Sequence, residues 1–312
     1  RRMRTYLDRF DLFISSYNIG SFGRPGIHLL ADFSWDETLR RQLDSTSSSA
    51  GALARVKGSF RNLYLALAKM ISRPAAHRNF GDLGIVFANS RWTAEVLGAR
   101  YAIDARLLYP PVTMREPGAS SGPRRRRFVC VGRISPEKRV EQMIGILRAV
   151  RARGHDIALH IIGATRETTY GRMIERMCRS EGSWIVLEGR RFGASKTRLL
   201  AESAFGIHAR AREAFGIAVA EMITVGCVPF VPAEGGPAEI VNYNPAIVYS
   251  SPEDGIEKID AMLRNSTLER DTRALLLKQA SLFSCESFIR GIRTAVGSFI
   301  DQQRLGDGVA DL

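Results

Sequence analysis

The sequence predicts an α/β protein with parallel, doubly wound sheets, and three observations support that prediction. From residue 128 to residue 250, short apolar segments typical of strands alternate regularly with segments of helical periodicity. A shorter strand and helix pattern precedes residue 115. The 312 residues, 45% of them apolar, suffice to bury the cores of two such units. Strands joined by helices imply right-handed crossovers, so the sheets should be parallel and Rossmann-like.

The amino-terminal part contains three predicted strands. Residues 11–16 and 26–33 are short apolar runs between turn-forming residues, and residues 84–88 are a third run. Ser90 follows the third strand and is predicted to cap a helix. Residues 52–71 place apolar side chains every three to four positions, which predicts an amphipathic helix with a basic second face. That helix either packs on its own sheet or lies on an anionic membrane surface.

A stretch rich in glycine, proline, serine and arginine separates the two halves at residues 115–127. We therefore predict one domain at residues 1–122, a second at 123–284 and a helical segment at 285–312. The second domain has six predicted strands, at 128–132, 157–163, 184–189, 206–210, 228–232 and 246–250. Ligands of doubly wound sheets bind beyond the carboxyl ends of the strands, so the loops after these strands should face the site.

Composition restricts the class of protein and partner. Cys130, Cys178, Cys227 and Cys285 lie far apart, with no Cys-x-x-Cys pair or histidine cluster, so no metal site is predicted and a cytoplasmic location fits. No apolar run reaches the length of a membrane span, and the first ten residues are too polar for a signal peptide. The net charge of +13 indicates an anionic partner: nucleic acid, an acidic membrane or a phosphorylated ligand. A genome of high GC content favours arginine and would give the same charge without any such partner.

The first candidate site follows the first strand of the second domain. Gly132 ends that strand, and a helix is predicted to begin with Ser135 as its cap and Pro136 as its first residue. Helix N-termini attract phosphate, and Arg133 and Lys138 flank this one. The pattern therefore indicates a phosphate site, although an ordinary capped helix with two solvated cations would give the same sequence pattern.

Two further patterns lie in the second half. Glu213 falls in a loop, and Glu221 falls in the helix after it. Glu221 has apolar neighbours, among which a carboxylate without a binding partner would be unfavourable. Gly216 between them lets a ligand approach the backbone. Residues 226–240 form a strand, a paired-glycine turn and a helix that opens with Pro237, which alone is only a turn signal.

Taken in order, these motifs resemble a known family. They are GR-x-x-x-EK, then E-x7-E written as EAFGIAVAE, then G-x-P-x-V-x-x-x-x-GG-P-x-E-I. Together they are similar to the retaining glycosyltransferases of family 4, whose GT-B fold has two Rossmann-like domains facing across a cleft. The segment GIHARAREAFGIAVAEM is nearest to the α-1,2-mannosyltransferases of the lipid-linked oligosaccharide pathway, where a histidine also precedes the E-x7-E segment.

The resemblance implies a role for each matching residue. Arg133 and Lys138, next to Gly132, would clamp the donor pyrophosphate, and Glu213 would hold hydroxyls of the transferred sugar. These cations and Glu213 would be the catalytic groups. The remaining donor contacts would be Glu221 to the ribose, the backbone of Ala214, Phe215 and Gly216 along the sugar and phosphates, and Arg190 near the nucleobase.

The resemblance is weaker in the amino-terminal part. The chain lacks the opening strand and glycine-rich loop of that family, so we expect a truncated first domain. His28 and Asp32 are the candidates for the acceptor-side residue, which in the family is a histidine. The family fold also implies that the last helix, at 285–312, returns toward the first domain.

The resemblance implies a retaining transferase that moves a hexose to a lipid-linked or polysaccharide acceptor. GDP-mannose is favoured over a UDP-sugar as donor, and no metal or other cofactor is expected. We expect a cytoplasmic protein, either free or bound peripherally at the inner face of a membrane. Two alternatives stay open: a sugar-nucleotide-binding remnant with weak catalysis, and a basic nucleic-acid-binding protein. The second is less favoured because no aromatic and basic interleaving is present.

Overall fold

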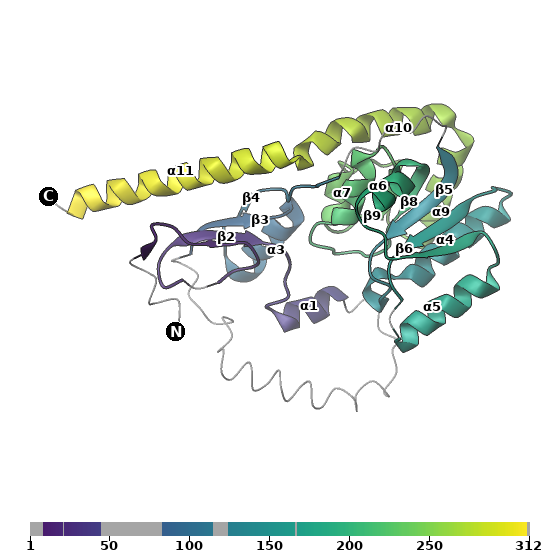
Figure 1. Cartoon of the computed structure of the whole chain (residues 1–312), viewed down its shortest axis with the longest axis horizontal. Coiled ribbons are helices and arrows are strands. Elements are labelled where there is room, and N and C mark those ends of the chain that lie inside the picture. The colour runs from purple at the N-terminus through teal and green to yellow at the C-terminus, as the bar shows by residue number, and fades with distance from the viewer. Residues whose placement is uncertain (1–8, 21, 45–82, 115–123, 166, 311–312) are drawn as a thin grey trace.

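Two parallel β-sheets, joined by a long carboxy-terminal helix, make up the computed structural model (Figure 1). The structure describes residues 9–20, 22–44, 83–114, 124–165 and 167–310. The predicted amphipathic helix at 52–71, with its proposed membrane face, lies outside the described residues. Within the described ranges, no helix combines the length and apolarity that crossing a bilayer needs.

The first sheet has the strand order β1-β2-β3-β4, with every pair parallel. Its elements are β1 (Ile14–Ser15), β2 (Gly26–Leu30), α1 (Glu37–Asp44), β3 (Gly84–Ala88), α3 (Arg91–Tyr101) and β4 (Arg106–Leu107). The strand predicted at 26–33 ends at Leu30, because the backbone N–H groups of Ala31 and Asp32 donate to the Asn18 side chain rather than to a neighbouring strand. Asn18 itself adopts a left-handed conformation with φ 64°, just after β1, so the strand predicted at 11–16 is also short.

The second sheet has the strand order β10-β9-β8-β5-β6-β7. Its strands are β5 (Arg125–Val131), β6 (Ala158–Ile162), β7 (Ile185–Gly189), β8 (Ser203–Ile207), β9 (Val228–Pro232) and β10 (Val248–Tyr249). The helices are α4 (Val140–Ala152), α5 (Thr169–Ser180), α6 (Gly193–Ala201), α7 (Ile217–Thr224), α8 (Gly236–Ile240), α9 (Pro252–Arg264) and α10 (Ser266–Gln279). The regular alternation predicted from residue 128 onward is therefore present.

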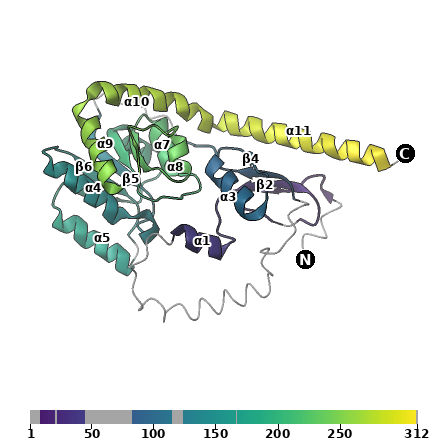
Figure 2. The same ribbon diagram turned by 180° about the vertical axis from the view of Figure 1, so that it is seen from behind.

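Helices cover both faces of this second sheet, and the central strand shows why. Phe128 of β5 packs into the core that α4, α5 and α9 share, and these helices lie together in Figure 2. The next residue, Val129, packs against Leu200 of α6 and Met222 of α7 on the opposite face. Successive residues of a strand point to opposite faces, so a continuous apolar run is required when both faces are covered.

The helix after β5 begins later than predicted. Pro136–Lys138 form a single 3-10 turn, and the Ser135 side chain makes no capping hydrogen bond. Arg139 then adopts a left-handed conformation with φ 50°, and α4 starts at Val140. The Val140 N–H donates to the Tyr170 hydroxyl at 2.9 Å. The predicted start at Pro136 is therefore present, but as a single 3-10 turn and not as the N-terminus of the long helix, so little helix dipole is available there for phosphate binding.

The arginine run belongs to the sheet rather than to a linker, since β5 already begins at Arg125. Arg127 is buried, and its guanidinium donates to Ser203 Oγ at 2.9 Å and to Glu202 at 3.1 Å. The Arg124 guanidinium donates to backbone carbonyls that follow α6 and α7. These cations therefore stabilise the second unit at the amino end of its central strand. The predicted boundary between residues 122 and 123 lies outside the described residues.

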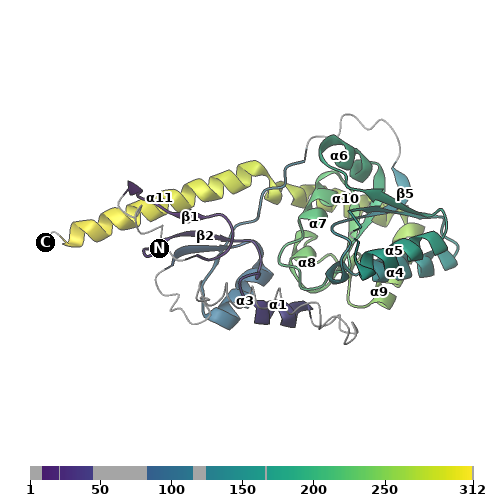
Figure 3. The same cartoon turned by 60° about the horizontal axis from the view of Figure 1, so that its bottom comes forward.

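The last helix, α11 (Cys285–Ala310), runs from the second unit along the first sheet (Figures 1 and 3). Its Ala295 and Phe299 pack against Ile27 of β2 and against Ile85 and Phe87 of β3. The side chains in this cluster are almost fully buried. The carboxy-terminal helix therefore completes the core of the amino-terminal sheet.

Candidate active site

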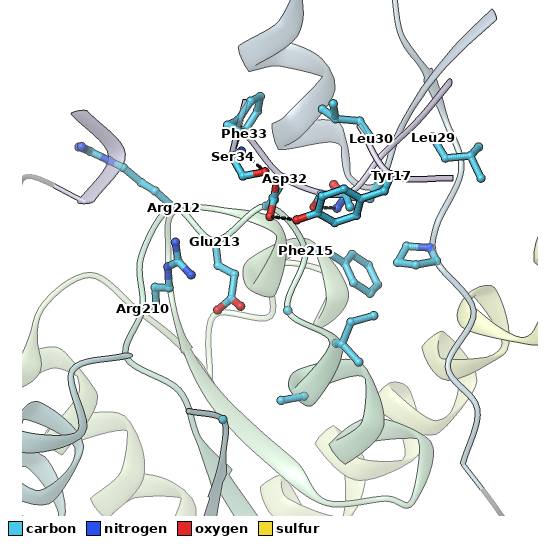
Figure 4. Close-up of a pocket in the computed structure, with 18 of the residues that line it drawn as sticks. Tyr17, Leu29, Leu30, Asp32, Phe33, Ser34, Arg210, Arg212, Glu213 and Phe215 are labelled. Atoms are coloured by element: carbon cyan, nitrogen blue, oxygen red, sulfur yellow. Dashed lines mark hydrogen bonds between the residues drawn. The ribbon is translucent and has the colours of Figure 1, made fainter. Parts of the chain in front are cut away.

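A cavity of about 1020 Å³ lies between the two units. One wall comes from the loops after β1, β2 and β3, and the other comes from the loops after β5 and β8. Figure 4 shows Asp32 and Tyr17 on the first wall, facing Arg210, Glu213 and Phe215 on the second. The cavity is at the carboxyl ends of the strands, where doubly wound sheets bind their ligands.

Glu213 lies in the loop after β8, and its side chain contacts two basic residues. Lys138 Nζ donates to Oε1 at 2.6 Å, and His208 Nε2 lies 2.7 Å from Oε2, although at a poor angle for a hydrogen bond. Burial alone would raise the pKa of the Glu213 carboxyl. The contacts with His208 and Lys138 oppose that effect and hold the pKa well below its ordinary value. Glu213 is therefore an ionised, oriented acceptor at the wall of the cavity.

The second carboxylate, Glu221, lies in the middle of α7 and also lines the cavity. It is 9% exposed, and its Oε1 accepts a hydrogen bond from Lys196 Nζ at 2.5 Å. Lys196 comes from α6 and lines the same cavity. This pairing explains how a carboxylate is tolerated among the apolar residues of α7, because a buried charge needs a partner. The second oxygen of Glu221 is left to accept from a ligand.

We call residues 213–216 the donor loop, because the family resemblance predicts its donor contacts there, and a paired-glycine turn packs against it. Gly235 forms a parallel bridge with Glu213, and the Gly236 N–H donates to the Glu213 carbonyl at 2.8 Å. A Cβ at Gly236 would lie 2.6 Å from the Ala214 carbonyl oxygen and from the Phe215 Cα, which no side chain tolerates. The paired glycines, which in the sequence were only a turn signal, thus allow α8 to approach the donor loop.

The donor loop ends at Gly216, which occupies the cap position of α7 with φ 105°. A non-glycine residue would be strained in that conformation. Ile217 and Ala218 form the first turn of α7 and line the cavity. The N-terminus of α7 therefore supplies the helix end that the sequence had placed at Ser135, and helix N-termini favour anions.

Four further cations line the cavity beside Lys138 and Lys196: Arg40, Arg133, Arg210 and Arg212. Arg133 is largely exposed, with only a loose contact of 3.7 Å to Glu137. Arg212 pairs with Glu234 at 2.7 Å. Guanidinium groups suit the geometry of phosphate oxygens. The cavity thus combines cations for a phosphate with paired carboxylates for hydroxyl groups.

Asp32 is held on the opposite wall by three donors. Its Oδ2 accepts from the Tyr17 hydroxyl at 2.9 Å, and its Oδ1 accepts from Asn18 at 3.0 Å and from the Ser34 N–H at 2.9 Å. Burial alone would raise the pKa of Asp32, but these hydrogen bonds lower it below its ordinary value. The structure therefore places one of the two acceptor-side candidates in the cavity.

The other acceptor-side candidate, His28, is not at the cavity. Its side chain is 1% exposed, stacks on the Phe22 ring at 4.8 Å and has Nε2 3.1 Å from the Leu83 carbonyl. Burial lowers the pKa of His28, so it is a neutral core residue. Its assignment to the acceptor side was wrong, because from its position within β2 the side chain packs against Phe22 and not into the cavity.

Arg190 is also absent from the cavity lining. It follows β7, the edge strand, and β6 separates β7 from the central strand β5. The cavity lies beyond β5 and β8 instead. The other predicted donor contacts all line the cavity: Gly132, Arg133, Lys138, Glu213, Ala214, Phe215, Gly216 and Glu221.

Sequence reasoning missed Arg40, Lys196, His208 and Arg212, and it named Arg210 only as the position of a loop that should face the site. His208 precedes the E-x7-E segment in the sequence, but nothing local assigned it a partner. Lys196 lies 25 positions before Glu221, in a different helix, so only the tertiary fold brings the two together. The described residues include no cluster of three or more side chains placed to bind a metal ion.

Comparison with known proteins adds independent information. The family model described as Glycosyl transferases group 1 matches residues 119–276, just over half of the chain. A GDP-Man:Man(3)GlcNAc(2)-PP-Dol alpha-1,2-mannosyltransferase of Candida glabrata is 28% identical over 174 residues, covering 49% of this chain and 34% of the relative. The chain therefore spans about a third of the length of the curated relatives it matches.

Solved structures match the fold. Sucrose-phosphate synthase from Thermosynechococcus elongatus superposes with a TM-score of 0.63 at 15% identity, covering 91% of this chain and 68% of that one. WaaG, a glycosyltransferase involved in lipopolysaccharide biosynthesis, gives a TM-score of 0.59 at 18% identity, covering 89% and 76%. At these identities the likeness concerns the fold alone. It confirms the predicted GT-B arrangement of two Rossmann-like units.

Proposed function

The chain belongs to the group 1 glycosyl transferases, and from this premise we propose that it transfers a hexose from a nucleotide-sugar to an acceptor with retention of configuration. One observation carries the proposal. Glu213 is held ionised in the wall of a cation-lined cavity, beside the N-terminus of α7. A fixed carboxylate next to phosphate-binding cations suits a ligand that has both hydroxyl groups and a diphosphate.

In the proposed binding mode, the sugar hydroxyls donate to Glu213 and the ribose hydroxyls donate to Glu221. Lys196 holds Glu221 in place at 2.5 Å. The diphosphate lies near Arg133, Lys138 and the N-terminus of α7. Lys138 has three N–H donors and uses one for Glu213, so two stay available for phosphate oxygens.

The proposed reaction needs no nucleophile from the protein. The bond between the anomeric carbon and the phosphate oxygen breaks, and the acceptor hydroxyl attacks the same face of the sugar. The leaving phosphate oxygen takes the proton of that hydroxyl. Negative charge grows on the phosphate as the bond breaks, so Arg133 and Lys138 would stabilise the transition state more than the bound substrate.

For the donor we propose GDP-mannose, without a further cofactor, and for the acceptor a lipid-linked glycan. The support is the activity for which the curated relatives are named, the transfer of mannose from GDP-mannose to a dolichol-linked oligosaccharide. A lipid-linked acceptor would require the protein to work at a membrane surface, and we propose a peripheral location on the cytoplasmic side. Asp32, on the wall opposite Glu213, is the proposed acceptor-side residue.

Steady-state kinetics of two variants test the proposal. Glu221→Ala should raise the donor KM about tenfold with little change in kcat, because ribose contacts are the same in the ground state and the transition state. Glu213→Ala should mainly lower kcat, by about a hundredfold, because contacts to the transferred sugar tighten as charge develops.

A matched control is Asp260→Asn on α9. Asp260 also pairs with a histidine and an arginine, His155 at 2.6 Å and Arg264 at 3.0 Å, but does not line the cavity. It should keep wild-type kinetics. Near-wild-type kinetics in both glutamate variants would refute the proposed roles.

A further inference from the structure

The donor loop is also held by the amino-terminal unit. Ser90 Oγ donates to the Ala214 carbonyl oxygen at 2.6 Å, and Thr93 Oγ1 donates to the same oxygen at 3.0 Å. A carbonyl oxygen has two lone pairs and accepts both hydrogen bonds. Ser90 and Thr93 are completely buried. These contacts cross from the first turn of α3 to the loop that contains Glu213.

A buried carboxylate fixes the first turn of α3 in that position. Glu239 of α8 is 4% exposed, and its Oε2 accepts from the Arg91 N–H at 2.8 Å. Its Oε1 accepts from the Tyr109 hydroxyl at 2.6 Å. A carboxylate at a helix N-terminus is favoured by the helix dipole. As a result α3 and α8, from different units, lie side by side (Figure 3).

The direction of the Ala214 carbonyl decides where the next N–H points. A trans peptide is planar, so its C=O and N–H point in opposite directions. With the carbonyl of Ala214 directed at α3, the Phe215 N–H is directed away from α3. Among the described residues, no backbone acceptor pairs with that N–H. Both Ala214 and Phe215 line the cavity, so a ligand oxygen can accept the hydrogen bond.

We propose that Ser90 and Thr93 are positioning residues for sugar transfer, which hold the Ala214 carbonyl and thereby orient the Phe215 N–H and the Glu213 side chain toward the donor. The inference rests on the proposed function. It adds that the donor loop is correctly oriented only when the two units are docked as in this structure. The amino-terminal unit then contributes to donor chemistry through Ser90 and Thr93, as well as to acceptor binding.

The test separates the hydrogen bond from the helix cap. Ser90 Oγ also accepts from the Thr93 N–H at 3.0 Å, so Ser90→Ala removes a cap as well. Thr93→Val keeps the shape and the cap and removes only the hydroxyl. We expect Thr93→Val to lower kcat about fivefold, and the double variant Ser90→Ala, Thr93→Val to lower it about fiftyfold. The loss per hydrogen bond is thus smaller than the loss that follows direct removal of an oxyanion donor. The donor KM should change less than twofold, and Thr93→Ser should restore kcat.

The matched control is Ser251→Ala, which removes the cap of α9 far from the cavity. It should lower the melting temperature as much as Ser90→Ala does, yet leave kcat at the wild-type value. Wild-type kcat in both hydroxyl variants, in an active enzyme, would overturn the inference and leave the proposed function intact. Failure of Thr93→Ser to restore kcat would show a packing role and would also overturn it. If the wild-type chain transfers no sugar, the proposed function fails and this inference fails with it.

Discussion

At the scale of single residues, Glu213 shows how burial and charge compete. Removal from water opposes the ionised carboxylate, but Lys138 and His208 reverse the balance and lower the pKa. The sequence predicted a functional carboxylate at this position from the E-x7-E spacing. It did not predict the pairing with Lys138, because the two residues lie 75 positions apart and meet only through the order of β5 and β8 in the sheet.

A lowered pKa makes the stability of the protein depend on pH. The folded pKa of Glu213 lies below the ordinary value of 4.5, so its carboxylate contributes fully above that pH and the contribution is lost as the pH falls through the folded pKa. Glu213→Gln should lower the free energy of unfolding by about 2 kcal/mol at pH 7, less than for a fully buried pair. The difference should shrink steadily below pH 4.5.

Chemical denaturation between pH 7 and pH 3 would measure this effect. Glu257→Gln, which breaks an exposed pair with Arg153, is the control and should change stability little at any pH. Parallel curves for the wild-type chain and Glu213→Gln would contradict the charge balance described for Glu213.

His28 and Arg190 show the limit of assignment by residue type. His28 lies within a predicted strand and Arg190 directly follows one, yet neither residue lines the cavity. The side to which a strand residue points depends on register, and the reach of a loop residue depends on strand order. Neither property is visible in a single sequence without the partner strands.

At the scale of helices and strands, local signals located most elements but not their first turns. Ser135 and Pro136 are favourable helix-start residues, yet the chain makes a 3-10 turn there and α4 begins at Val140. The Tyr170 hydroxyl accepts a hydrogen bond from the first N–H of α4, and this tertiary contact outweighs the local preference. Conversely, the Gly235 and Gly236 pair gave a weak local signal but has a specific role beside the donor loop.

That role can be tested by adding one methyl group. Gly236→Ala would place a Cβ 2.6 Å from the Ala214 oxygen, so the donor loop or α8 must move. We expect a loss of about 2 kcal/mol in stability, typical of overpacking, and at least tenfold weaker donor binding. Denaturation and donor titration would measure both.

Gly145→Ala is the matched control, since a Cβ at this position in α4 meets nothing within 4 Å. It should raise stability by about 0.5 to 1 kcal/mol, the gain expected for alanine in a helix, and leave donor binding unchanged. Wild-type donor affinity in Gly236→Ala would show that the glycine turn does not set the loop geometry.

At the scale of the whole molecule, apolar periodicity predicted the second unit well. Strands buried on both faces are continuous apolar runs, and β8, β9 and the segment 128–131 of β5 have this pattern. The first unit was harder to predict, because it completes its core with Ala295 and Phe299 of α11, more than 200 positions after β3. Part of the net charge of +13 does not indicate an anionic partner, since Arg124 and Arg127 form hydrogen bonds inside the fold.

The cavity between the units is the feature that most of this account depends on, and thermal stabilisation tests it directly. The melting temperature should be measured with GDP-mannose, GDP, UDP-glucose, UDP-N-acetylglucosamine and UDP in turn. A ligand that binds only the folded chain stabilises it by about 2.7 kcal/mol at one hundred times its Kd. We predict a clear rise with GDP-mannose and GDP, a small one with the uridine compounds, and about half the wild-type rise with GDP-mannose in Glu221→Ala. No shift of the wild-type chain with any nucleotide would contradict the assignment of the cavity as a nucleotide-sugar site.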